Sequence, residues 1–202
     1  MGDRLVDLWW SDLRSVDAGL FDVLDATEAE RCRGIVGAAD RGRFVLGVAL
    51  LRVAVAAATG GDARSVVVDR TCSDCGAPHG APQVDGARVS VAHAGPLVLV
   101  GTASEPVGVD VEAVDRGEDV AQWVLREAAF KTGLTGAGSA DDHGARHDAG
   151  RPTVTTIHVP APWPGHLAAV ALAGDDEPRL RVHGLEESAQ AVARLVQGSS
   201  AG

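Results

Sequence analysis

The alternation of apolar and polar residues over residues 106–112 predicts a β-strand in the middle of the chain. The segment reads Pro-Val-Gly-Val-Asp-Val-Glu, so its valines lie on one face of the strand while Asp110 and Glu112 lie on the other. Ten residues, 113–122, separate this strand from a segment of helical spacing in which Trp123, Glu127 and Lys131 share one stripe. The pattern therefore predicts that Glu127 on the helix lies near Asp110 and Glu112 on the strand.

Three carboxylates that converge offer an all-oxygen site for a hard cation such as Mg²⁺, which keeps several waters and also binds substrate phosphates. We interpret Asp110, Glu112 and Glu127 as candidate metal ligands. The same spacing is also typical of a half-solvated strand, and of a surface helix in which Glu127 pairs with Lys131. The spacing alone leaves both interpretations open.

The remaining patterns predict strands and helices in both halves of the chain. Helices are expected from about residue 25, over 41–59 with an end at Gly60-Gly61, and over 185–202; strands are expected at 5–10, 65–69, twice within 89–102, at 157–159 and at 166–173. This repetition predicts an α+β protein of two related lobes with a cleft between them. We place the N-terminal lobe at 1–105 and the C-terminal lobe at 106–202, the latter with a mobile loop at 133–151 and a frayed tail.

Composition narrows the function classes. The 202 residues carry a net charge of −10, which disfavours a nonspecific nucleic-acid binder. The polar N-terminus and the short apolar runs predict neither a signal peptide nor a transmembrane segment. Three cysteines suit a reducing cytoplasm better than a disulfide scaffold. Residues 31–52 hold five arginines and one acid, which fits either a phosphate-binding patch or a solvated helix face.

Cys72 and Cys75 form a Cys-x-x-Cys pair four residues before His79. Such a pair is found in structural zinc sites and in redox motifs, but no second pair completes a four-ligand set in this sequence. A metal site would need Cys32 and His79 to converge on the pair. We therefore favour cysteines that pack in a turn and keep a structural metal as the alternative.

Several motifs in one order resemble the Sfp-type 4'-phosphopantetheinyl transferases. Val-Gly-Val-Asp-Val-Glu and the later Trp-x-x-Arg-Glu-Ala-x-x-Lys-x-Gly resemble the paired signature of that family. Upstream, Val89–Gly95 resembles its His-containing strand, residues 79–82 (His-Gly-Ala-Pro) its Gly-Lys/Arg-Pro turn, and residues 43–52 its first-half helix. The similarity extends over about residues 5 to 136.

The resemblance implies two pseudo-twofold lobes, each a small, mostly antiparallel sheet packed with a long helix. It implies Mg²⁺-dependent transfer of 4'-phosphopantetheine from coenzyme A to a serine of an apo acyl or peptidyl carrier protein in a biosynthetic pathway. Asp110, Glu112 and Glu127 would hold Mg²⁺, with Glu127 also as general base and Lys131 beside the pyrophosphate. The residues implied to bind coenzyme A are Arg31, Arg43, His79, Gly80, Pro82, His93, Gly95 and Lys131.

The sequence departs from the family pattern at three places. Ala81 replaces the Lys or Arg of the turn, Ala92 and Ala94 replace the serines beside His93, and ten residues stand where the family has a few tens before the Trp helix. A diverged protein that keeps the fold, and acts on another small molecule or as an interaction protein, is therefore the alternative function. The shortened segment also predicts uncovered apolar residues (Val120, Val124 and Leu125) and a homodimer or partner contact near 113–125.

Overall fold

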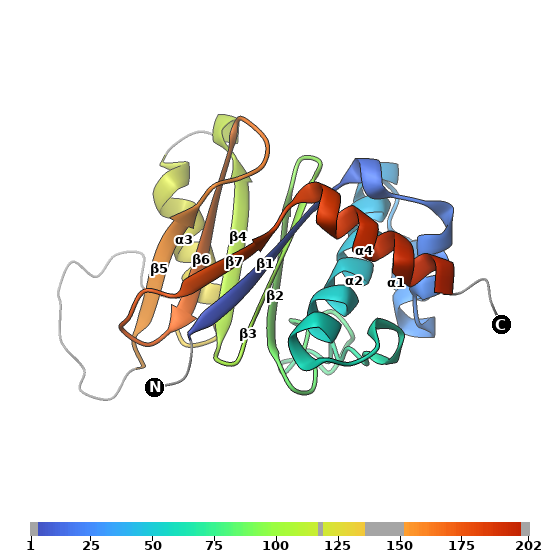
Figure 1. Ribbon diagram of the computed structural model, residues 1–202, viewed down its shortest axis with the longest axis horizontal. Helices are drawn as coiled ribbons and strands as arrows, with labels where there is room; N and C mark the ends of the chain where they lie inside the picture. Colours follow the sequence, from blue (N-terminus) through green and yellow to red (C-terminus); the bar gives the residue numbers. More distant parts are fainter. Residues whose placement is uncertain (1–3, 117–118, 136–151, 199–202) are drawn as a thin grey trace.

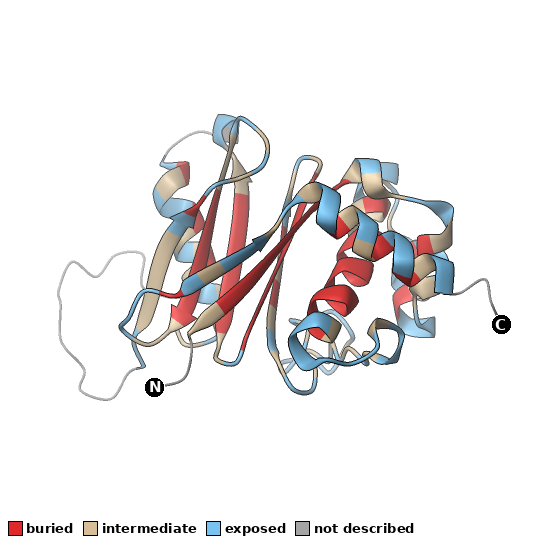
Figure 2. Ribbon diagram, viewed as in Figure 1, coloured by how far each residue is buried: buried red, intermediate tan, exposed pale blue. Residues whose placement is uncertain are grey.

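The computed structural model describes residues 4–116, 119–135 and 152–198, and it has a mixed α+β fold with two small sheets. The sheets pack face to face, and each is covered on its outer side by helices, so the chain forms four layers (Figure 1). Buried residues concentrate in the strands and in one central helix (Figure 2). The predicted mobile loop at 133–151 lies mostly outside the described residues, as does the tail beyond residue 198.

The larger sheet has the strand order β2-β3-β1-β7. Strands β1 (Leu5–Asp12), β2 (Arg88–Ala94) and β3 (Leu97–Ala103) pair in antiparallel fashion, as the sequence predicted for the first half. The sequence pattern missed β7 (Arg179–His183), which pairs in parallel with β1. Asp7 on β1 accepts hydrogen bonds from Arg181 and His183 on β7, so polar side chains as well as the backbone fix this strand.

Two helices lie on the outer face of this sheet, and a third packs against them. Helix α1 (Ala26–Gly34) begins at a capping box formed by Asp25 and Glu28. Helix α2 (Ala38–Thr59) ends at Gly60, which adopts a left-handed φ of 72°. Helix α4 (Leu185–Gln197) packs its apolar side, with Val192 and Leu195, into the same core.

Helix α2 is long and apolar enough to cross a membrane by length and composition alone, so the expectation that no segment reaches that threshold is wrong. In the fold, this helix is the main core element: residues 45–55 are all buried, and they pack on Trp9, Val98 and Val100 of the sheet. An Arg52 that is 4% exposed sits within that stretch.

The smaller sheet has the order β4-β6-β5, with β4 (Val107–Ala113), β5 (Val154–Val159) and β6 (His166–Ala173) all antiparallel. Helix α3 (Val120–Lys131) covers its outer face by packing Val124 and Ala128 on Ala169 and Ala171. The inner face contributes its valines to a core shared with the larger sheet.

The two sheets meet where the edge strand β2 approaches the edge strand β4. The buried Ser90 hydroxyl on β2 accepts a hydrogen bond of 3.0 Å from the backbone N–H of Val109 on β4. This bond satisfies a donor that an edge strand would otherwise leave unpaired. It fixes the start of β4, and therefore Asp110, relative to the first sheet.

Two boundaries predicted from the sequence need correction. Residues 65–69 form no strand; only an isolated bridge joins Asp69 to Gln83 after a short 3₁₀ turn at Ala63–Ser65. The segment 106–202 does not form one lobe, because β7 pairs with β1 and α4 packs against α2. The chain after residue 178 returns to the first sheet.

A buried ion pair between α1 and α2 provides the first prediction. Arg52 donates hydrogen bonds of 3.0 and 2.8 Å to the two carboxylate oxygens of Glu28, and both residues are about 4% exposed. We expect Glu28→Gln to lower the free energy of unfolding by about 3–5 kcal/mol, because Arg52 would be left buried with its nearest carboxylate, Asp25, at 3.9 Å. Glutamine preserves the capping box, so the change isolates the charge.

Chemical denaturation of both variants measures this loss against a matched control. Glu30→Gln removes an exposed carboxylate of the same helix, and its effect should stay within about 0.5 kcal/mol. Adding Arg52→Met to Glu28→Gln should recover much of the lost stability, since no unpaired charge then remains. Equal stabilities of Glu28→Gln and Glu30→Gln would contradict the prediction.

Candidate functional site

Strand β4 places Asp110 on the face of the smaller sheet that α3 covers. Its valines enter the core between the sheets, and the alternate positions, 108 and 110, therefore face the helix. The strand and the helix touch at Gly108, where a Cβ would overlap the carbonyl oxygen of Ala128 and would lie 3.1 Å from Lys131 Cβ. This close approach brings the last turn of α3 directly over Asp110.

Lys131 is the partner of Asp110. Its Nζ donates a hydrogen bond of 2.7 Å to Asp110 Oδ1 and another of 3.2 Å to the carbonyl oxygen of Val109. Asp110 is 5% exposed, and among the described atoms its Oδ2 is buried without a hydrogen-bond partner. Burial raises the pKa of Asp110, while the charge of Lys131 opposes that rise.

The other two predicted carboxylates lie near this pair. Glu112, at the end of β4, and Glu127, on α3, are half-buried, and the negative charge of each also raises the pKa of Asp110. The structure thus groups all three carboxylates with Lys131. Their oxygens do not all lie within 4.8 Å of one another; among the described residues, only Cys72, Cys75 and His79 form a possible metal-binding group that close.

The carboxylate group fits a hydrated hard cation. An unpartnered buried oxygen on Asp110 is costly unless a cation or a proton is present to satisfy it. Two further acidic side chains nearby add negative charge that such a cation would neutralise. Mg²⁺ holds its direct ligands at about 2.0–2.1 Å and keeps several of its waters, so carboxylates spaced as these are would reach it partly through those waters.

His93 and Arg43 lie beside this group on the first sheet and its helix. Arg43, on α2, donates a 2.6 Å hydrogen bond to the carbonyl oxygen of Gly95 and pairs with Asp40. The protein atoms around the His93 ring lower its pKa, and the positive charges of Arg43 and Lys131 lower it further. The His93 side chain is exposed. The two charges that act on it, those of Arg43 and Lys131, come from different halves of the fold.

A cavity of about 250 Å³ opens next to Lys131. Three segments form its walls: the loop and start of β2, the start of β4, and the end of α3. Its lining residues include Ala81, Pro82, Arg88, Pro106 and Lys131. The cavity is somewhat below the usual size range of small-molecule sites, and Lys131 is the residue that it shares with the carboxylate cluster.

The chain matches no family model and no curated protein sequence.

Not every predicted residue joins this site. Arg31 stacks over the ring of Phe44. Its positive charge lowers the pKa of Arg70, which is also close to Glu28 and Arg52. His79 lies with Cys75, at 3.0 Å. Gly80 is held in a tight turn in which its N–H donates to the carbonyl oxygen of Arg70, whereas Pro82 lines the cavity.

Two charged residues near the site were not predicted. Arg88 is the first residue of β2 and lines the cavity, and Asp40 holds the guanidinium of Arg43. Asp40 precedes Arg43 by one helical turn, which is a recognisable pairing signal. No comparable signal marks Arg88 in the sequence, because the cavity wall is built from segments that only the fold brings together.

The prediction that Val120, Val124 and Leu125 form an uncovered apolar patch on α3 is wrong. Val120 and Val124 are buried within the chain, and Leu125 packs partly against the same core. The exposed apolar side chains of this region are instead Val114 and Trp123, the latter beneath the guanidinium of Arg126. A homodimer or partner contact near 113–125 stays a prediction.

Proposed function

We propose that this protein transfers 4'-phosphopantetheine from coenzyme A to a serine hydroxyl of an apo acyl or peptidyl carrier protein. The observation that supports this best is the grouping of Asp110, which is buried with one unpartnered oxygen, with Glu112, Glu127 and Lys131, the last of which also lines a cavity. A structural role explains this group poorly, because three carboxylates around one cation destabilise the folded state. Two pseudo-twofold lobes with a cleft between them are part of the proposal, and the chain after residue 178 then belongs to the first lobe.

Asp110, Glu112 and Glu127 are the residues that would hold Mg²⁺. Bound there, the ion would neutralise charge on the pyrophosphate oxygens, which is the main requirement of phosphoryl transfer. The side chain of Lys131 is 29% exposed, and its Nζ pairs with the carboxylate of Asp110. It can therefore turn from Asp110 toward an incoming phosphate. His93 and Arg43 would receive the 3'-phosphate of coenzyme A.

The chain's own groups can move the proton of the reaction. The serine oxygen forms a bond to the phosphorus that carries pantetheine, and the bond from that phosphorus to the bridging oxygen breaks. Adenosine 3',5'-bisphosphate leaves with the bridging oxygen. Glu127 is half-buried and adjacent to the carboxylate group, so we assign it the serine proton, which it later releases to water.

Intact-mass spectrometry of apo carrier proteins tests this proposal. Each carrier is incubated with the protein, coenzyme A and Mg²⁺, and a gain of one phosphopantetheine is expected only when all three are present. Glu127→Gln should abolish the gain, whereas Glu186→Gln, an exposed change on α4, should leave it unchanged. If no carrier of the host is modified, the diverged, non-transferase alternative replaces this proposal.

The cavity wall leads to a prediction about coenzyme A affinity. Ala81 lies in that wall with Arg88 and Lys131, so Ala81→Lys adds a third cation beside the bound phosphates. We expect coenzyme A to bind more tightly by about 1 kcal/mol, since a charge-assisted contact is worth about 1.5–3 kcal/mol when buried and less at an open wall.

Calorimetry with coenzyme A and with its 3'-dephospho form measures this gain and locates it. Arg88→Ala should weaken binding by a similar amount. Asp85→Asn is an exposed control on the same loop. If Ala81→Lys leaves both affinities unchanged, the wall does not face the phosphates, and the placement of coenzyme A must be revised.

A further inference from the structure

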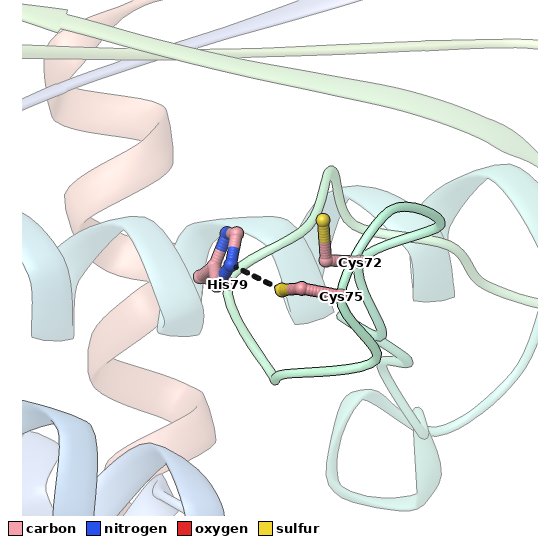
Figure 3. A group of neighbouring side chains, drawn as sticks. All are labelled: Cys72, Cys75 and His79. Carbon is pink, nitrogen blue, oxygen red and sulfur yellow. Dashed lines mark hydrogen bonds between the residues drawn. The ribbon is translucent and has the colours of Figure 1, made fainter.

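A loop on the surface brings two thiols and an imidazole together. Cys75 Sγ lies 3.0 Å from His79 Nε2, and Cys72 Sγ lies beside them (Figure 3). The three possible ligand atoms are all within 4.8 Å of one another, which holds for no other group of three His, Cys, Asp or Glu side chains in the described part of the chain. Cys32 does not take part, because it is buried in the core under α2.

Backbone hydrogen bonds hold this loop in shape without any help from the three side chains. Asp69 and Gln83 pair at its base through two bonds of 2.9 and 2.8 Å, and the N–H of Gly80 donates to the carbonyl oxygen of Arg70 at 2.7 Å. A Cβ at Gly80 would lie 2.8 Å from the carbonyl oxygen of Thr71, so this tight return requires glycine. The side chains are therefore presented by a preformed frame.

The backbone closes the turn between the two cysteines by its own hydrogen bonds. The N–H of Gly76 donates to the carbonyl oxygen of Cys72 at 2.9 Å, and Gly76 adopts a left-handed φ of 72°. The N–H of Cys72 donates to the carbonyl oxygen of Ala77, also at 2.9 Å. These bonds hold both cysteines close to His79.

We propose that Cys72, Cys75 and His79 form a zinc site in which water occupies the fourth position. Two thiolates and one imidazole are ligands that Zn²⁺ prefers, whereas Mg²⁺ prefers oxygen. At zinc bond lengths of about 2.0–2.3 Å, tetrahedral ligand atoms lie roughly 3.3–3.8 Å apart. The three ligand atoms, all within 4.8 Å of one another, are close to that spacing.

The site would fasten the loop that supplies one wall of the cavity. Ala81, Pro82 and Gln83 come just after His79 and Gly80 in the sequence and line that cavity. Zinc would join residues 72, 75 and 79 within the loop and so limit the movement of the wall residues that follow. This link to the cavity rests on the proposed function, whereas the zinc site itself does not.

Metal analysis of the purified full-length chain tests the site. After exposure to Zn²⁺ and dialysis under reducing conditions, the wild type should retain about one zinc ion per chain by plasma mass spectrometry. Cys75→Ser and His79→Ala should each lose most of it. Cys32→Ala and His158→Ala, which remove a core cysteine and an exposed histidine, should retain it.

Cobalt substitution identifies the ligands independently of activity. Co²⁺ in the wild type should give thiolate charge-transfer bands and the visible bands of a tetrahedral site, both weakened in Cys72→Ser, and circular dichroism should show that each variant is folded. A wild type that retains no more zinc than Cys75→Ser would overturn the site, as would equal loss in Cys32→Ala. Zinc retention without carrier modification would leave the site standing while refuting the transferase.

Discussion

Replacing Asp110 by asparagine should abolish Mg²⁺-dependent transfer, by about 10²–10³-fold or more, while the free energy of unfolding at neutral pH stays equal or rises. Both effects have one cause. Asp110 is buried with one unpartnered oxygen and with two other carboxylates nearby, an arrangement that stabilises a cation and destabilises the apo fold. Function and stability should therefore move in opposite directions.

The pH dependence of stability provides a second readout. The folded-state pKa of Asp110 is raised above its ordinary value of 3.8, first by burial. At pH values between the ordinary pKa of the unfolded chain and the raised pKa of the folded chain, Asp110 keeps its proton only when the chain is folded. The contribution of Asp110 to the free energy of unfolding therefore falls as pH rises from the lower pKa to the higher one. Asp110→Asn removes this contribution, and its unfolding free energy should fall less over the same range.

Thermal denaturation with increasing Mg²⁺ connects these effects to the ion. The wild type should gain stability with Mg²⁺ concentration, because a ligand that binds only the folded state stabilises it, and Asp110→Asn should not respond. Asp115→Asn, an exposed change after β4, serves as the control and should behave like the wild type. A variant at Asp110 that stays active at ordinary Mg²⁺ concentrations would show that the site is misassigned.

Gly108→Ala should be the most destabilising single methyl addition near the site, with a loss of about 3 kcal/mol. The new methyl carbon would overlap the carbonyl oxygen of Ala128 and lie 3.0 Å from its carbonyl carbon. These are backbone atoms, so no rotamer change relieves the overlap, and α3 must move away from β4. Because Glu127 and Lys131 belong to that helix, transfer should fall along with stability.

Gly34→Ala is the matched control for this prediction. No atom lies within 4 Å of a Cβ at Gly34, the last residue of α1, and alanine there should be neutral or stabilise by up to about 1 kcal/mol. Denaturant titration of both variants measures the difference, and the carrier assay measures activity. If Gly108→Ala unfolds like the wild type, the strand and helix are not in the close contact described.

The local pattern of the chain determined most of the elements near the site. The alternation over residues 107–111 placed the valines on one face and Asp110 on the other, and the structure has this arrangement. The helical stripe likewise placed Glu127 and Lys131 together on α3. Strand and helix periods depend only on backbone geometry, so a sequence is sufficient to reveal them.

Tertiary packing decided what each local pattern became. The sequence left β4 open as a half-solvated strand, but α3 covers its polar face, so Asp110 is buried and Lys131 serves as its counter-ion. Val120 and Val124, expected to be uncovered, are buried by the same contact. Periodicity shows which residues share a face, but only the fold shows which element packs on that face.

Long-range pairing was the other part that the sequence did not reveal. Strand β7 is short and half-polar, and its pairing with β1 depends on Asp7, about 170 residues earlier in the chain. His79 could be recognised as a possible ligand, but only the return of the loop at Gly80 brings it to Cys75. Spacing along a chain limits which side chains can meet; backbone hydrogen bonds between distant segments determine which of them do.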